Sequence, residues 1–81
     1  MKIYYTATSN GCRNNIKIAH TLMDSQDNLY NAIHQAKKGE IVRQYWITDE
    51  GKYQVCECRI EDGGYCNWTH RMTDKAIKTS A

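Results

Sequence analysis

The sequence predicts an α+β fold in which one helix packs on one face of an antiparallel sheet of about five strands. The chain has 81 residues, enough for a single domain (1–81) with one small core. Only one stretch, residues 25–38, repeats its apolar residues at helical spacing, whereas the segments around it alternate with the period of strands. Together these observations predict the order β-β-α-β-β-β.

The first two strands are expected at residues 2–8 and 16–22. The first segment is rich in β-branched and aromatic residues, which suit a strand. Asn10-Gly11 follows it as a turn signal, because asparagine and glycine tolerate positive φ. In the second segment the apolar residues share one parity, which predicts that their side chains lie on one face.

The helix is expected at residues 25–38. Asp24 or Ser25 can cap its start by accepting hydrogen bonds from the amides of the first turn. Gly39 stands where a helix favours a left-handed residue at its end. A single apolar stripe follows the helical repeat, formed by Leu29, Ala32, Ile33 and Ala36.

Residues 41–48, 52–60 and 65–72 are expected to form three strands in two consecutive hairpins. Both connections, Asp49-Glu50-Gly51 and Asp62-Gly63-Gly64, resemble three-residue loops in which a turn is followed by a left-handed glycine. This loop type fixes the cross-strand pairs Arg43–Glu57, Tyr45–Val55, Ile47–Tyr53, Cys58–Trp68 and Ile60–Cys66. The tail from about residue 73 is expected to start a helical turn or to fray.

This register sorts the last three strands into two faces. The face expected under the helix carries Val42, Trp46, Cys56, Cys58, Ile60, Cys66, Trp68 and Met72. The other face carries Tyr45, Ile47, Tyr53, Val55 and Tyr65, with Arg43, Arg59 and Arg71 at its rim. One helix cannot cover both faces, and exposed aromatic and arginine side chains are enriched at protein interfaces. The predicted partner-binding residues are Arg43, Tyr45, Tyr53, Arg59, Tyr65 and Arg71, together with Lys37 and Lys38.

The cysteines are expected to be reduced thiols in the core. Cys56 and Cys58 lie at alternate positions of one strand, about 6.5 Å apart, whereas zinc ligands favour a chain that folds back on itself. Zinc bound with Cys66 and His70 is one alternative, and a disulfide is another. Neither a nucleophile–base constellation nor a nucleotide-binding loop is recognisable, so we expect no enzyme, no cofactor and no metal.

Charge and hydropathy narrow the classes of partner. Eleven Lys and Arg residues against nine Asp and Glu residues give a net charge of +2. With scattered cations and a pI of 8.4, this is weak support for a nucleic-acid-binding protein. The mean hydropathy of −0.76 and the absence of a long apolar run predict no membrane span. A cytoplasmic location is therefore expected.

The order of elements resembles that of small phage proteins that inhibit host machinery, among them type I anti-CRISPR proteins. The resemblance is one of topology over residues 2–72 and is carried by Met23-Asp24-Ser25, the Leu29–Ala36 stripe, Ile47-Thr48-Asp49-Glu50-Gly51 and Val55-Cys56-Glu57-Cys58. It implies a non-enzymatic inhibitor, acting in the host cytoplasm, that binds a host defence complex such as a type I CRISPR surveillance complex and blocks recognition of target DNA.

The partner of such an inhibitor would be a host protein or nucleoprotein complex, with some contact to nucleic-acid phosphates and none to membranes. The chain could act as a monomer or a homodimer. The alternative function is that of a small nucleic-acid-binding regulator, which would use the sheet face and the Lys and Arg residues on phosphates.

Overall fold

The computed structural model describes residues 2–9 and 14–79, which form one helix and a six-stranded antiparallel sheet. The predicted α+β class is thereby confirmed. In chain order the elements are β1 (Ile3–Ser9), β2 (Asn14–Ala19), α1 (Leu22–Gln35), β3 (Ile41–Thr48), β4 (Gly51–Ile60), the 3₁₀ turn η1 (Asp62–Gly64), β5 (Cys66–His70) and β6 (Ile77–Thr79).

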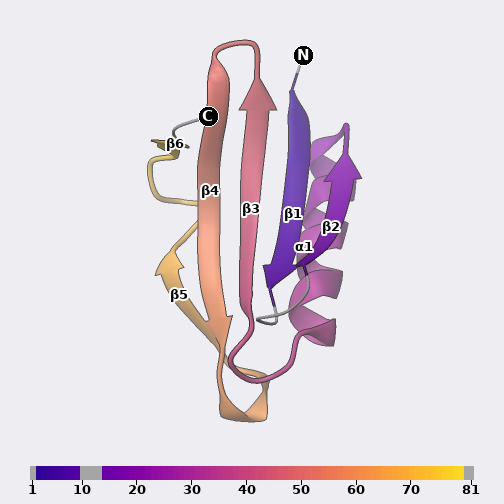
Figure 1. Ribbon diagram of the computed structural model, residues 1–81, viewed down its shortest axis with the longest axis vertical. Helices are drawn as coiled ribbons and strands as arrows, with labels where there is room; N and C mark the ends of the chain where they lie inside the picture. The colour runs from indigo at the N-terminus through magenta and orange to yellow at the C-terminus, as the bar shows by residue number, and fades with distance from the viewer. Residues whose placement is uncertain (1, 10–13, 80–81) are drawn as a thin grey trace.

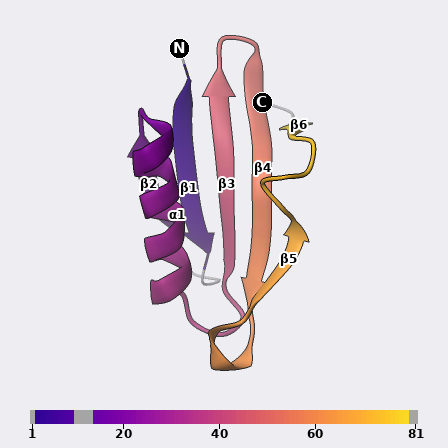
Figure 2. The same cartoon turned by 180° about the vertical axis from the view of Figure 1, so that it is seen from behind.

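The strands lie in the order β2-β1-β3-β4-β5, and β6 also pairs with β4. The first strand of the chain thus lies inside the sheet, between β2 and β3. β5 pairs with residues 57–60 of β4, and β6 pairs with residues 52–54. Helix α1 lies behind the sheet in Figure 1 and in front of it in Figure 2, so it packs on one face only.

The helix begins and ends three residues earlier than the sequence predicts. Thr21 is the cap, because its Oγ1 accepts a hydrogen bond from the Asp24 amide at 3.1 Å. Ser25 lies inside the first turns, where it is buried and donates to the Leu22 carbonyl at 2.7 Å. At the other end Ala36 is already extended, and Gly39 lies in the following turn with a φ of +89°.

Two other sequence-based boundaries are wrong. β2 is Asn14–Ala19 because the chain turns into the helix at Thr21, so Leu22 is helical. β5 ends at His70, which leaves the upper edge of β4 unpaired. The tail fills that edge as strand β6 instead of fraying or turning helical. The predicted Asn10-Gly11 turn lies outside the described residues.

Over the span in which the two strands pair, β4 carries one more residue than β3. Arg43 lies opposite Glu57, as predicted, and Gln44 lies opposite Cys56, but Tyr45 lies opposite Gln54. Val55 is therefore the extra residue of a β-bulge. The connecting loop correspondingly shortens to two residues, since Thr48 pairs with Gly51. The predicted pairs Tyr45–Val55 and Ile47–Tyr53 are wrong because the extra residue lies within the strand and not in the turn.

Because of the bulge, the side chains of β4 between the β3–β4 loop and Val55 lie on the opposite face of the sheet from the one predicted. Tyr53 lies opposite Trp46, and Lys52 lies opposite Ile47. Because side chains alternate along β3, Trp46 shares the face of Gln44, which contacts the helix. Tyr53 is consequently on the helix side of the sheet and not on the face where it was expected. Lys52 takes its place there.

The second hairpin has the predicted pairs next to its turn, and its register shifts only beyond Cys58, where Glu57 lies opposite His70. Cys58 lies opposite Trp68 and Ile60 opposite Cys66. Its turn uses Gly63 and Gly64 at φ values of +77° and +80°. Both glycines adopt the left-handed conformation that other residues rarely tolerate.

The core lies between α1 and the middle of the sheet. Its buried members are Leu29, Val42, Cys56, Cys58 and Ile60, and Ala32, Ile33, Ala36, Cys66, Trp68 and Met72 pack against them. The predicted helical stripe and the predicted helix-facing residues therefore meet here. Trp46 shares the predicted face but lies outside this cluster.

A buried glutamine joins the helix to the two central strands. Gln44 is fully buried, and its Nε2 donates to Thr6 Oγ1 at 3.0 Å and to the Ser25 carbonyl at 2.9 Å. These two bonds connect β3 to β1 and to α1 through one side chain. A buried donor with two partners is costly to remove, because both acceptors lose their bond and a void remains.

We expect Gln44→Ala to lower the free energy of unfolding by about 2–4 kcal/mol, a large share of the stability of a small domain. Urea denaturation measures this change. Gln54→Ala is the matched control, since Gln54 is partly exposed on the other face and should change stability by less than about 0.5 kcal/mol. Equal losses in both variants would contradict the role given to Gln44.

Candidate functional site

The sheet face opposite α1 has no second layer among the described residues, and Figure 1 looks directly onto it. We call it the open face. Alternation from Gln44 and Thr6, which face the helix, places the neighbouring side chains of each strand on this side. Its main members are Ile3, Tyr5, Ile16, Ile18, Arg43, Tyr45, Ile47, Lys52, Gln54, Glu57 and Arg59.

Two tyrosines and a lysine form a cluster at the centre of the open face. Tyr5 and Tyr45 are direct cross-strand partners, and their rings meet edge to face with centroids 5.7 Å apart. The Lys52 ammonium lies 4.3 Å from the Tyr45 centroid and 5.0 Å from that of Tyr5. Cation–π attraction favours this placement. The cluster thus joins β1, β3 and β4 on the solvent side.

Beside the cluster, the carboxylate of Glu57 on β4 is hydrogen-bonded to side chains of both neighbouring strands, β3 and β5. Glu57 accepts from Arg43 Nε at 2.6 Å and from Thr69 Oγ1 at 2.7 Å, one bond to each carboxylate oxygen. The hydrogen bonds from Thr69 and Arg43 lower the pKa of the Glu57 carboxyl below its ordinary value. Arg43 is thereby fixed in direction next to the tyrosines.

The chemistry of this face is suited to binding. Burial raises the pKa of the Tyr45 hydroxyl, so the ring stays neutral at pH 7. The face combines aromatic surface, exposed isoleucines and oriented cations. Ile16 and Ile18 are 48 % and 59 % exposed at its β2 edge. Aromatic, aliphatic and arginine side chains in this arrangement are typical of protein interfaces.

The structure brings together only part of the predicted partner-binding set. Arg43, Tyr45 and Arg59 share the open face, whereas Tyr53 lies on the helix side because of the bulge. Tyr65 is 75 % exposed, just before β5 and beyond the sheet centre. It does not join Tyr45.

The three remaining predicted residues lie beyond the ends of elements. Arg71 follows β5, where its amide donates to Asp74 Oδ2 at 2.7 Å. Lys37 and Lys38 follow the helix, and Lys38 pairs with Asp62 at 2.9 Å. These cations therefore do not rim the tyrosine–lysine cluster.

Sequence reasoning missed two residues at the centre of the site. Tyr5 lies on β1, and its partner strand β3 comes after the helix in the sequence. Tyr5 could therefore be placed beside Tyr45 only by predicting that the first strand pairs with the third. Lys52 reaches the open face through the bulge, for which the sequence carries no turn signal. The one available indication was the consecutive pair Tyr4 and Tyr5, because adjacent residues of a strand lie on opposite faces and one tyrosine must therefore be on the open side.

The described cysteines lie on the helix side and not at the open face. Cys56 and Cys58 are buried free thiols, and burial raises their pKa values to about 11 and about 12. Both are therefore protonated at neutral pH. Across residues 2–9 and 14–79, no three His, Cys, Asp or Glu side chains gather as metal ligands. Cys12 lies outside these ranges.

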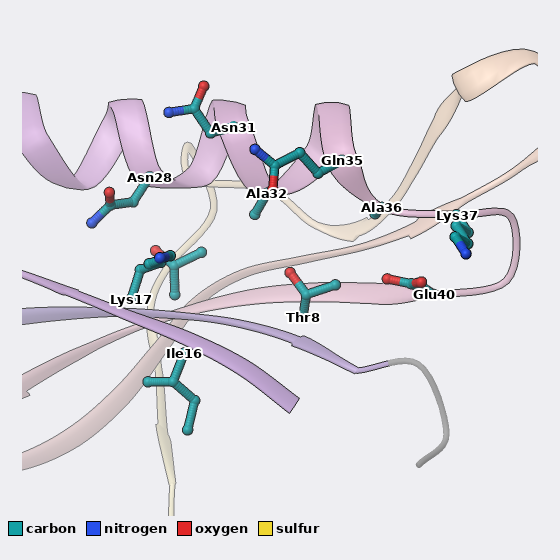
Figure 3. Close-up of a pocket in the computed structure, with 11 residues that line it drawn as sticks. Thr8, Ile16, Lys17, Asn28, Asn31, Ala32, Gln35, Ala36, Lys37 and Glu40 are labelled. Carbon is teal, nitrogen blue, oxygen red and sulfur yellow. The ribbon is translucent and has the colours of Figure 1, made fainter. Parts of the chain in front are cut away.

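The hollow drawn in Figure 3 lies on the other side of the sheet, between α1 and strands β1 and β2. Asn28 and Gln35 of the helix and Thr8 and Lys17 of the strands line it. The hollow lies on the helix side with Lys17, and at the β2 edge it is also lined by Ile16, which belongs to the open face.

Comparisons with protein-family models, with curated proteins and with solved structures find no match to this chain. Within the described part of the chain, α1 is neither long nor apolar enough to cross a membrane. The case for function therefore depends on the open face itself.

We expect Glu57→Gln to destabilise the protein by about 1–2 kcal/mol at pH 7, because two hydrogen bonds lose their charged acceptor. The folded-state pKa is lowered, so this stability is present above the unfolded pKa and is lost as pH falls through the folded pKa. Urea midpoints should therefore converge for the two proteins under acid conditions. A gap that stays constant from neutral to acid pH would contradict this account, and Glu50→Gln at the exposed hairpin tip is the control.

Proposed function

We propose that this protein is a non-enzymatic inhibitor that binds a partner protein complex through its open face. The observation that carries the proposal is the uncovered tyrosine–lysine cluster, which lies beside the oriented Arg43–Glu57 pair. In a small domain, an aromatic face without a second layer is a site for a partner.

The charged residues of the open face indicate what kind of partner surface would be complementary to it. Arg43, Lys52 and Arg59 supply three positive charges against one negative charge from Glu57. The tyrosines and the isoleucines of β1 and β2 form the apolar part. A complementary partner surface has an apolar part that faces β1 and β2 and an acidic part that faces β3 and β4, since opposite potentials steer and orient association.

A protein partner suits this face better than a nucleic acid. Bases stack on aromatic rings, yet the Lys52 ammonium already lies over both tyrosines. Arg43 is directed to Glu57, so its guanidinium is not free to serve a phosphate alone. Phosphate-dominated binding would instead require unpaired, clustered cations.

The resemblance in topology to phage inhibitors supplies the target class. On that basis, the protein occupies a surface of a type I CRISPR surveillance complex in the host cytoplasm and blocks target DNA. The direct test mixes the purified chain with a purified surveillance complex and labelled target DNA. Loss of DNA binding at stoichiometric amounts of the chain is the expected result.

The tyrosine at the centre of the open face should carry much of the binding free energy. We expect Tyr45→Ala to raise the concentration for half inhibition at least tenfold, equivalent to about 1.4 kcal/mol. Tyr53→Ala should have a smaller effect on inhibition, because Tyr53 lies on the helix side. Tyr30→Ala is the matched control, since Tyr30 is 64 % exposed on the helix.

Two results would contradict the proposal. Absence of any complex between the chain and the surveillance complex would remove this target. A shift of free DNA by the chain alone, lost by orders of magnitude between about 50 and 200 mM salt, would favour the nucleic-acid-binding alternative.

A further inference from the structure

Strand β2 is an end strand of the sheet. It pairs with β1 on one side, and no described strand lies on its other side. Backbone groups alternate in direction along an antiparallel strand, so every second residue of Asn14–Ala19 directs its N–H and C=O away from β1. Such an edge is a template for one further strand. The opposite edge differs, since β5 and β6 are only five and three residues long.

β2 lacks most of the features that protect edge strands from pairing. Its six residues contain no proline, and its ladder with β1 runs from Tyr4–Ala19 to Ser9–Asn14 without a bulge. Ile16 and Ile18 are about half-exposed on the open face, and a strand added along this edge would bury part of both. The edge is therefore regular, apolar on one face and accessible for pairing.

On the helix side, the same edge borders the hollow of about 570 Å³ between α1 and the first two strands. Ile16 is an open-face residue that also lines this hollow, so the hollow extends to the outer edge of β2. Figure 3 shows Asn28 extending from the helix toward the strands and Lys17 extending from β2 toward the helix. A side chain of an added strand would reach this polar space.

The ammonium of Lys17 determines the charge at this edge of the hollow. The described residues provide no ion-pair partner for it. The carboxylate among the lining residues, Glu40, lies at the other end of the hollow with Lys37 in Figure 3. Opposite charges directly across a strand pair attract each other, and like charges repel. The partner residue opposite Lys17 should therefore be acidic.

The alternation of β2 defines the sequence pattern that fits this edge. Residues directly opposite each other in a sheet lie on the same face. A partner residue opposite Lys17 therefore lies on the helix side, and its two neighbours, opposite Ile16 and Ile18, lie on the open face. A slip of one residue would place the acidic side chain against an isoleucine. The matching segment is extended and carries one acidic residue between two apolar residues.

We infer that the outer edge of β2 binds an extended segment of a partner protein by strand addition, and that Lys17 and its flanking isoleucines select an apolar–acidic–apolar sequence. A second copy of this chain fits less well, because pairing both isoleucines with isoleucines places Lys17 opposite Lys17 of the second copy. The two isoleucines also belong to the open face. Recognition here uses the backbone of β2, however, and does not depend on the proposed function.

The test titrates the blocked peptide acetyl-Thr-Val-Glu-Val-Thr-amide into the full chain and follows the backbone amide resonances. Concentrations up to about 5 mM are used because a short segment binds weakly. The matched probe has Lys in place of Glu. We expect shifts along residues 14–19, slower hydrogen exchange at the outward amides of β2, and at least about fivefold weaker binding of the Lys peptide.

A charge reversal at Lys17 tests the selectivity. Lys17→Glu should bind the Lys peptide more tightly than the Glu peptide, because the attraction and the repulsion are exchanged. Lys78→Glu is the matched control, since Lys78 is an exposed lysine of β6 at the opposite edge, and it should keep the wild-type preference. Unchanged resonances outside β2 confirm that Lys17→Glu, a substitution of an exposed side chain, is folded.

Three results would overturn the inference. The first is the absence of shifts along β2 with either peptide, and the second is equal affinity for the two peptides. The third is a set of β2 resonances that shift with protein concentration when no peptide is present, because this would place a second copy on the edge.

Discussion

The extra residue at Val55 determines what each face of the sheet displays. Had β4 paired with β3 without a bulge, the turn would have held the extra residue and Tyr53 would have joined the open face. Instead the bulge brings Lys52 to that face, where its ammonium lies over Tyr5 and Tyr45. It also sends Tyr53 to the side of Trp46. The set of side chains on the open face is therefore a consequence of one irregularity in the pairing of β3 with β4.

The second constraint is that the helix packs on one face only, against β1, β2 and β3. Gln44 binds the helix to β1 and β3 from within, so the helix is held on that side. The opposite side keeps its tyrosines, isoleucines and paired charges in contact with solvent. Such a face costs free energy to leave exposed, and a partner surface recovers that cost through burial.

Much of the fold could be predicted from the sequence, and the exceptions share a physical reason. The third strand, the helical stripe and the pairs Cys58–Trp68 and Ile60–Cys66 follow from local period and glycine turns. The start of the helix could not be predicted in this way, because Thr21 and Ser25 are chemically similar caps and only tertiary contacts select between them. Lys52, Tyr53 and strand β6 depend on the bulge and on an edge of β4 that β5 leaves free.

The central claim is that the open face contacts the partner, and hydroxyl-radical footprinting of the bound chain tests it most directly. The method reports the solvent exposure of individual tyrosines. The account predicts that Tyr5 and Tyr45 become protected in the complex while Tyr30, exposed on α1, does not change. Protection of Tyr30 and of the neighbouring exposed Met23, with Tyr5 and Tyr45 unchanged, would contradict it and place the interface on the helix.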